Sequence, residues 1–162
     1  MKILGIDPGL ATIGYGVIKK YKKRGRGKAT LKCLDYGLIK TTPALKSPER
    51  LKKINNELSR LIKKHRPDIL ATENIYFFKN LKTAIPVSQA VGVILLTAAK
   101  NKLPVSSFTP LQVKMAVTGF GRAEKKTVQK KIMKVLGLKE LPKADDIADA
   151  LAVALTYLIK EA

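Results

Sequence analysis

The order in which strand-like and helix-like segments follow one another constrains the fold of this 162-residue chain most strongly. Three strand-like runs come first, and helices and strands then alternate to the end. Early hairpin strands followed by such alternation place antiparallel and parallel pairs in one sheet. We therefore expect an α/β fold, a single domain over 1–162 with a mixed five-stranded sheet flanked by helices. The predicted strands are Lys2–Asp7, Ile13–Ile18, Ala29–Thr41, Pro67–Glu73 and Val105–Thr109.

The predicted helices begin at residues that favour helix starts. Ser47 is expected as an N-cap with the following proline in the first turn, and Thr109 is followed by proline in the same way. Pro86 is acceptable in a helix over Thr83–Lys100 only because it lies close to the predicted start. Two further helices, each with apolar side chains recurring on one face, are predicted over Glu124–Leu136 and Asp145–Ile159.

Charge separates this chain from an ordinary small domain. It has 32 lysines and arginines against 12 aspartates and glutamates, a formal net charge of +20. Thermophilic proteins also carry many lysines, but they usually balance them with glutamate, which this chain does not. Such an excess attracts polyanions, so nucleic acid is the leading partner class.

Scarce residue types exclude several kinds of protein. The single cysteine, Cys33, rules out an intramolecular disulfide and a cysteine zinc site, and the single histidine, His65, gives little basis for a histidine metal site. The N-terminal residues lack the apolar core of a signal peptide. The most apolar stretch, Val87–Ala99, is shorter than the roughly 20 residues that a membrane span needs. We expect a soluble, cytoplasmic protein with no membrane partner.

The few acidic residues carry most of the information about function. Asp7 and Glu73 each end a predicted strand, and sites in open α/β sheets gather outside such strand ends. Asp146 and Asp149 share one face of the last helix. Four clustered carboxylates repel one another unless a cation neutralises them, and oxygen ligands of this kind suit Mg²⁺ or Mn²⁺. Two such ions, about 4 Å apart, can activate water and stabilise the leaving oxygen in phosphodiester cleavage.

Each acid alone also has a structural interpretation. Asp7 precedes Pro-Gly and is a typical turn former. Asp145 and Asp146 begin a helix, where acids interact favourably with the helix dipole. Glu73 is harder to explain in this way, because an acid among apolar residues at a strand end is seldom left unpaired. Together, in so basic a chain, the four acids favour a metal site.

The ordered set of motifs resembles the RuvC family of bacterial Holliday junction resolvases. The resemblance runs nearly from end to end and rests on Asp7-Pro-Gly after an apolar strand, on Glu73 followed by aromatic residues, and on Lys-Ala-Asp-Asp-Ile-Ala-Asp-Ala-Leu-Ala at 143–152. Further matching motifs are Gly14-Tyr15-Gly16, Gln112-Val113-Lys114 and Gly119-Phe120-Gly121 with Glu124-Lys125.

The resemblance implies an RNase-H-like (retroviral-integrase-like) fold that forms a single nuclease domain. It also implies a homodimer that resolves a four-way DNA junction by symmetrical paired nicks, in DNA recombination and repair. The RuvA–RuvB branch-migration complex is a partner implied in the same way. The resemblance also implies two bound Mg²⁺ ions, with Mn²⁺ as substitute. It makes their ligands Asp7, Glu73, Asp146 and Asp149.

The resemblance also assigns residues around those ligands. The family spacing selects Asp146 over Asp145, which would then be a neighbouring acid, and whether Asp145 shares in the site stays open. Lys114 and Lys125 match positions that meet DNA near the scissile phosphate. Tyr76 matches an aromatic that contacts the junction and is often Phe in relatives. Phe77 and Phe78 are alternatives for this role. We expect at least one of the three aromatic residues to belong to the core.

Two basic groups have both a DNA-binding and an ordinary interpretation. The segment Lys19–Lys28 has seven basic residues in ten, with glycines that permit a tight turn. It would follow a phosphate backbone or simply be solvated. The residues at its tip are Lys22, Lys23 and Arg24. The same alternatives apply to the row Lys126, Lys130 and Lys134.

Other functions and assemblies remain open. The segment Gly-Ile-Asp-x-Gly also opens the phosphate loop of sugar kinases and actin-like ATPases, but this chain is too short for two lobes around a nucleotide. A non-catalytic nucleic-acid-binding protein would explain the charge but not the acids. The helix Thr83–Lys100 is more apolar than one core-facing stripe requires, which indicates either a homodimer interface or burial wholly within the monomer.

Overall fold

The computed structural model describes residues 1–21, 29–74, 81–140 and 144–160. Within these residues three strands come first and helices and strands then alternate. The strands are β1 (Lys2–Asp7), β2 (Thr12–Tyr21), β3 (Thr30–Lys40), β4 (Ile69–Glu73) and β5 (Val105–Phe108). The helices are α1 (Ser47–His65), α2 (Leu81–Lys100), α3 (Pro110–Thr118), α4 (Lys125–Leu136) and α5 (Asp145–Lys160).

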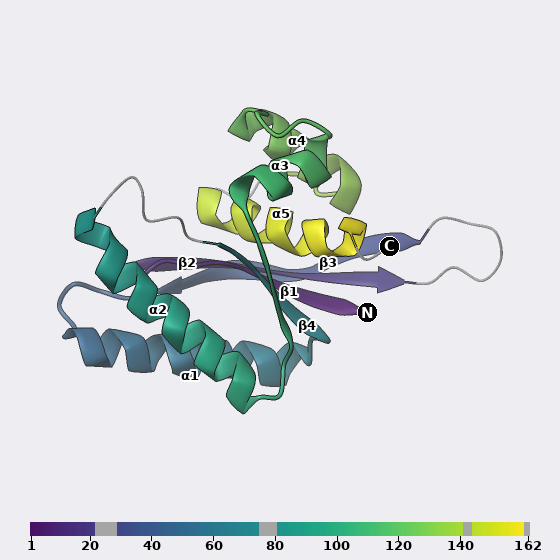
Figure 1. Cartoon of the computed structure of the whole chain (residues 1–162). Coiled ribbons are helices and arrows are strands. Elements are labelled where there is room, and N and C mark those ends of the chain that lie inside the picture. Colours follow the sequence, from purple (N-terminus) through teal and green to yellow (C-terminus); the bar gives the residue numbers. More distant parts are fainter. Residues whose placement is uncertain (22–28, 75–80, 141–143, 161–162) are drawn as a thin grey trace.

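The strands of the described residues form one five-stranded sheet in the order β3-β2-β1-β4-β5. The first three strands pair antiparallel, whereas β1 with β4 and β4 with β5 pair parallel. The predicted mixed sheet flanked by helices is confirmed. Because β1 and β4 are parallel neighbours, their carboxyl ends lie side by side at the same end of the sheet (Figure 1).

Helices cover both faces of the sheet. One face carries α5, with α3 and α4 packed above it, and the other carries α1 and α2 (Figure 1). Side chains alternate along β1, so Ile3 joins the apolar core under α5, whereas Leu4 and Ile6 join the core over α1 and α2. The same alternation puts Asp7 on the face that α5 covers.

Glycines allow α5 to approach the sheet closely. Gly14 of β2 is the partner of Asp7 across the β1–β2 ladder. A Cβ atom at Gly14 would overlap the backbone oxygen of Asp146, and one at Gly5 would overlap that of Ala150. The missing side chains therefore let the helix backbone rest on the strands. This contact brings the first turn of α5 to the carboxyl end of β1.

Some predicted helix starts differ from the structure. The prediction that Ser47 is an N-cap is wrong, because the cap position is Lys46, whose backbone N–H donates to Glu49 Oε2 at 2.9 Å. Glu49 thus satisfies this helix start from within the first turn. The Thr109 cap is confirmed, since its Oγ1 accepts from the backbone N–H of Gln112 at 3.1 Å. Helix α2 begins at Leu81, two residues before its predicted start.

None of the helices in the described residues has the length and apolarity to cross a lipid bilayer.

Candidate active site

Glu73 ends β4 beside the carboxyl end of β1 and faces a cavity of about 220 Å³. Residues of β4, α3, α4 and α5 line this cavity, so it lies where the ends of the sheet meet the upper helices. Its ionisable lining consists of Glu73, Lys114, Lys125 and Asp149. Its remaining wall is mostly apolar and consists of Pro110, Val113, Val128 and Ala152. The cavity thus combines charged groups with an apolar wall.

Lys125, the first residue of α4, connects that helix to α5. Its Nζ donates to Asp149 Oδ2 at 2.9 Å and lies 3.4 Å from Asp145 Oδ2. Burial alone would lower the pKa of Lys125, but the hydrogen bonds to Asp149 and then to Asp145 raise it above its ordinary value. The ammonium is therefore held in the charged form at the mouth of the cavity.

Asp145 shares Lys125 with Asp149, but it is not among the charges that raise the pKa of Asp7. Gln129 Nε2 of α4 donates to Asp145 Oδ1 at 3.0 Å, and the aspartate side chain is 64% exposed. Sequence reasoning did not find Gln129. The available signal was its position one turn after Lys125 on the same side of the predicted helix.

The remaining acids act on Asp7 from two elements, β4 and α5. Burial, which is the largest cause, and then the charges of Asp149, Glu73 and Asp146 together raise the pKa of Asp7 to about 7, while Lys125 opposes them. Asp7 has therefore lost most of its preference for the ionised form at neutral pH. This repulsion shows that the four acids singled out in the sequence lie around one place in the fold.

Glu73 responds to the same surroundings. Burial raises its pKa, Asp149 adds to the shift, and Lys114 and Lys125 partly offset it. Both lysines assigned to the scissile phosphate therefore lie within electrostatic reach of the acids. Burial and the neighbouring acids nevertheless outweigh the lysines, since the pKa values of Asp7 and Glu73 are both raised.

This donor set fits a divalent cation in its chemistry. Carboxylate oxygens are the ligands that Mg²⁺ and Mn²⁺ prefer, and a cation would remove the repulsion that raises the pKa of Asp7. As the side chains stand, however, no three acidic, histidine or cysteine residues in the described ranges are grouped closely enough to hold one ion. The acids would have to draw together around the metal.

Several predicted contact residues lie outside the described residues. These are Lys22, Lys23, Arg24, Tyr76 and Phe77, together with the alternative Phe78. Their assignments therefore rest on the sequence alone. The predicted residues that the structure does bring together are Asp7, Glu73, Lys114, Lys125, Asp146 and Asp149.

Comparison with protein families finds one match over nearly the whole chain. The family model described as crossover junction endodeoxyribonuclease RuvC matches residues 3–157. The RuvC protein of Syntrophomonas wolfei is 52% identical over 158 residues, which are 98% of this chain and 88% of that protein. The RuvC protein of Fusobacterium nucleatum is 45% identical over 158 residues, which are 98% of this chain and 80% of that protein.

Solved structures show the same similarity in three dimensions. Thermus thermophilus RuvC superposes with a TM-score of 0.90 at 34% identity, covering 99% of this chain and 95% of the Thermus chain. A second Thermus thermophilus RuvC structure, in complex with a Holliday junction substrate, superposes with a TM-score of 0.87 at 31% identity and the same coverage. The yeast mitochondrial resolvase Ydc2 shares the fold, with a TM-score of 0.67 at 14% identity, covering 97% of this chain and 78% of its own.

Proposed function

This chain belongs to the RuvC family of crossover junction endodeoxyribonucleases, and we propose that it resolves Holliday junctions by hydrolysing one phosphodiester bond in each of two strands. The observation that carries the proposal is the convergence of four carboxylates, from β1, β4 and α5, beside a cavity that also contains two lysines. The net charge of +20 supports a nucleic-acid substrate. As part of the same proposal, the protein acts in DNA recombination and repair in the cytoplasm. Residues 1–162 then form a single domain.

The proposed ligands of two Mg²⁺ ions, with Mn²⁺ as substitute, are Asp7, Glu73, Asp146 and Asp149. When bound, such ions supply an activated water and stabilise the oxygen that leaves the phosphate. Asp145 is left out of this set, because Gln129 holds one of its oxygens and its charge is not among those that raise the pKa of Asp7. The proposal also accounts for the raised pKa of Asp7, since a site built for cations is repulsive without them.

The lysines have a role that follows from their surroundings. Lys114 and Lys125 line the cavity beside Glu73, where the apolar part of the wall strengthens electrostatic interactions. A phosphate that enters the cavity gains negative charge on its oxygens as the bond to the leaving group breaks. Both ammonium groups are placed to neutralise that charge, and the contact with Asp149 orients Lys125 for this role.

DNA contacts outside the cavity are proposed on sequence grounds. Tyr76 and Phe77 follow Glu73 by three and four residues, so the chain cannot carry them more than about 14 Å from the end of β4. Either ring would stack on a base at the junction. At the tip of the basic segment, Lys22, Lys23 and Arg24 would contact phosphates.

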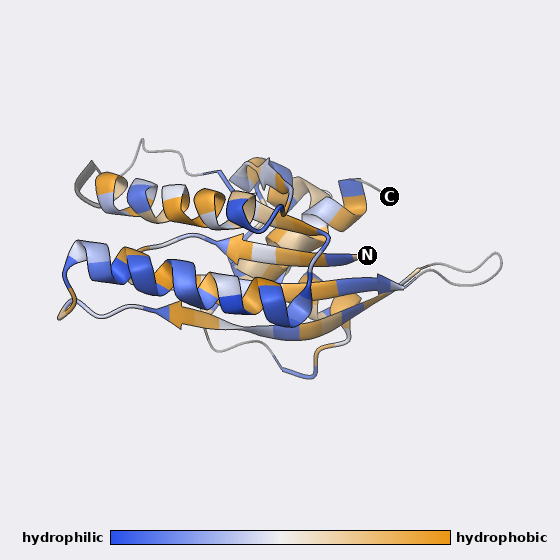
Figure 2. Cartoon of the chain, turned by 90° about the horizontal axis from the view of Figure 1, so that it is seen from below, coloured by the Kyte–Doolittle hydropathy of each residue, from blue (hydrophilic) through white to orange (hydrophobic). Residues whose placement is uncertain are grey.

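We also propose a homodimer through the outer side of α2. One side of α2 packs into the core through Ala90, Ile94 and Ala98. Three large apolar side chains on the helix are exposed by 70%, 42% and 54%, and these are Ile85, Leu95 and Leu96. Figure 2 shows hydrophobic residues along α2, whereas α1 beside it is largely hydrophilic. Burial within one chain does not account for these side chains, and a two-fold partner would cover them.

The dimer has a simple test. Sedimentation at micromolar concentration should show a dimer that Leu96→Glu converts to a monomer, while Asn56→Glu on the exposed side of α1 has no effect. A wild-type monomer, both with and without DNA, would contradict the proposal.

RuvA–RuvB is the partner complex proposed from the family.

Cleavage of a synthetic four-way junction tests the proposed function. We expect paired nicks at symmetrical positions in Mg²⁺, or in Mn²⁺, and none when EDTA removes the metal. A linear duplex of the same sequence is the matched control and should be cut far more slowly. Binding of the junction without cleavage in either metal would instead support a non-catalytic nucleic-acid-binding protein.

A further inference from the structure

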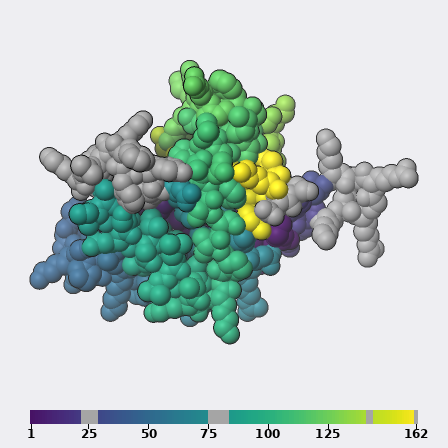
Figure 3. All heavy atoms as spheres, in the orientation of Figure 1, coloured from purple at the N-terminus to yellow at the C-terminus, as the bar shows by residue number. Residues whose placement is uncertain are grey.

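Helix α4 carries an unusual distribution of charge. Five of its twelve residues are lysines and none is acidic. Of these, Lys125 enters the active-site cavity. Lys126, Lys130 and Lys134 are spaced by one turn and exposed, while the opposite side of the helix buries Val128 and Ile132. Figure 3 shows the upper helices, among them α4, standing out from the body of the molecule.

The row is unfavourable for the helix that carries it. Lysines at i and i+4 repel one another, and a cation in the first turn of a helix opposes the helix dipole. In the described part of the chain no carboxylate lies within ion-pair distance of Lys126, Lys130 or Lys134. The described residues thus leave these three charges without an ion-pair partner.

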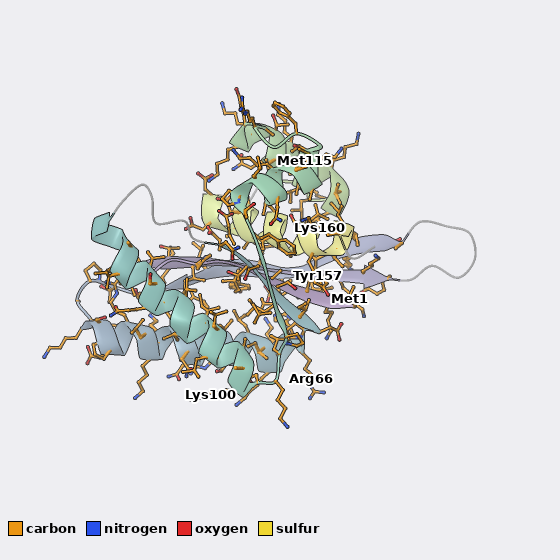
Figure 4. All side chains as sticks on the ribbon, viewed as in Figure 1. Met1, Arg66, Lys100, Met115, Tyr157 and Lys160 are labelled. Atoms are coloured by element: carbon orange, nitrogen blue, oxygen red, sulfur yellow. The ribbon has the colours of Figure 1, made fainter. Side chains whose placement is uncertain are left out.

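Some other basic residues of the molecule have ordinary explanations. Arg66 and Lys100 lie at the ends of α1 and α2, at the bottom of the view in Figure 4. Cations at helix C-termini interact favourably with the helix dipole. On α1, acidic residues accompany the basic ones, and Arg60 pairs with Glu57 at 2.7 Å. On α4 the helix dipole accounts for Lys134, which lies in the last turn, but neither explanation applies to Lys126 or Lys130.

The row also has the dimensions of a DNA backbone contact. Lys126 and Lys134 are eight residues apart, or about 12 Å along the helix. The same length of duplex presents about three to four phosphates on each strand. At the far end of the row, Lys130 and Lys134 line a hollow of about 500 Å³ together with Lys139. The row therefore begins next to the active site and ends at a further basic recess.

We propose that Lys126, Lys130 and Lys134 bind the phosphate backbone of a duplex arm of the junction and direct that arm away from the active site along α4. The proposal rests on the proposed function, because it requires the scissile strand to lie in the cavity beside Lys125. It assigns the row to affinity and to the path of the arm. Chemistry stays with the carboxylates and with Lys114 and Lys125.

The experiment compares two triple variants with the same change in charge. One is Lys126→Gln, Lys130→Gln, Lys134→Gln. Its matched control, on the opposite face of the sheet, is Lys52→Gln, Lys53→Gln, Lys63→Gln, which also removes three exposed lysines that have no ion pair in the described residues. Binding to a synthetic four-way junction is measured across a salt series, and nicking is measured in single turnover at saturating protein. Circular dichroism and thermal melting establish that both variants fold.

The α4 variant should flatten the slope of log affinity against log salt by up to about 2.7 units, at about 0.9 per lost phosphate contact. Its nicking rate at saturation should stay within about twofold of wild type. The α1 control should change neither quantity appreciably, and a Lys→Arg version of the α4 variant should restore the wild-type slope. Equal slopes for the α4 and α1 variants would overturn the proposal.

Neutral methylphosphonates locate the contact on the DNA. They replace the four phosphates next to the scissile one, separately on each of the two arms that flank the nick. On one arm this replacement should remove the difference in affinity between wild type and the α4 variant. An unchanged difference on both arms would overturn the proposed path. If the wild-type protein does not nick the junction at all, the proposed function fails. An equal change of slope in both triple variants would then show that the lysines attract DNA only through their overall positive charge.

Discussion

The two faces of the sheet treat charge in opposite ways. On the face that α1 and α2 cover, Asp35 of β3 accepts a hydrogen bond from Lys64 at 2.7 Å and lies 2.8 Å from His65 Nε2. On the face that α5 covers, Asp7 is buried among three other acids, and its pKa rises to about 7. Charge pairs on the first face connect a helix to the sheet. On the second face, burial and charge repulsion raise the pKa of Asp7 at the proposed metal site.

This difference in charge pairing between the two faces indicates which residues contribute to stability and which contribute to activity. Removing a paired charge below the sheet should cost stability and leave activity intact. Removing a repelled charge above the sheet should raise the stability of the metal-free protein and destroy activity. Such an exchange of stability for function is common at active sites. The four predictions below test it, beginning with the largest expected effect.

Asp146→Asn should abolish junction nicking and preserve junction binding. The amide keeps the shape of the side chain but removes a charge from the proposed metal site. Binding should be equal or tighter, because a negative charge near the DNA phosphates is lost. Single-turnover nicking and a binding titration measure the two effects.

Asp145→Asn is the neighbouring control for that prediction. Asp145 accepts a hydrogen bond from Gln129 and is not among the charges that act on Asp7, so its variant should retain substantial nicking. An inactive Asp145→Asn together with an active Asp146→Asn would move the proposed ligand by one residue along α5.

The choice between these two aspartates shows what the sequence could predict. The strand ends at Asp7 and Glu73 follow from short apolar runs, and both predicted ends coincide with the observed ones. The spacing of Asp146 and Asp149 places them on one helix face, but Asp145 also lies one turn from Asp149. Only contacts between elements, such as Gln129 with Asp145, separate the two.

Contacts over long sequence distances explain the rest of what sequence reasoning missed. The order β3-β2-β1-β4-β5 depends on pairing between segments as distant as β1 and β4. The pairing of Lys125 with Asp149 depends on how α4 packs against α5. The Ser47 error is local, because serine and the preceding residue compete for one cap and Glu49 decides it through its hydrogen bond to Lys46.

Lys114→Ala and Lys125→Ala should each lower the nicking rate at saturating protein by about 100-fold or more, in the range found when one group that stabilises transition-state charge is removed. Affinity should fall much less. If added protein restores the full rate, the two lysines are phosphate anchors only. Lys131→Ala, which removes another α4 lysine that is absent from the cavity lining, is the control and should keep the wild-type rate.

Asp7→Asn should stabilise the metal-free protein. Because the folded-state pKa of Asp7 lies above its value in the unfolded chain, ionised Asp7 destabilises the fold, and the wild type loses stability as pH rises through about 7. We expect the variant to exceed wild type by about 2–4 kcal/mol at pH 8 in EDTA and by little at pH 4. Urea unfolding at the two pH values measures the difference.

Mg²⁺ provides the control for this effect. The metal should raise the unfolding midpoint of the wild type more than that of Asp7→Asn, since the variant has lost a proposed ligand. A variant that is less stable than wild type at pH 8 in EDTA would show that Asp7 is stabilising, which would remove the contrast between the two faces.

Asp35→Asn is the opposite case and should have the smallest effect. Burial would raise the pKa of Asp35, but hydrogen bonds from Lys64 and His65 bring it below its ordinary value. A lowered pKa contributes stability that is present above the unfolded value near 4 and lost as pH falls through the folded value. The free energy of unfolding of the variant should therefore be about 1 kcal/mol lower than that of wild type at pH 7. The two should be equal once the pH is below the folded-state pKa of Asp35.

Glu57→Gln, which breaks an exposed pair on the same face, should cost less than about 0.5 kcal/mol. Nicking by both variants at saturating protein should equal that of wild type, because neither acid reaches the cavity. A loss of nicking by folded Asp35→Asn would show that the face below the sheet takes part in catalysis, and the separation of stability from activity would not hold.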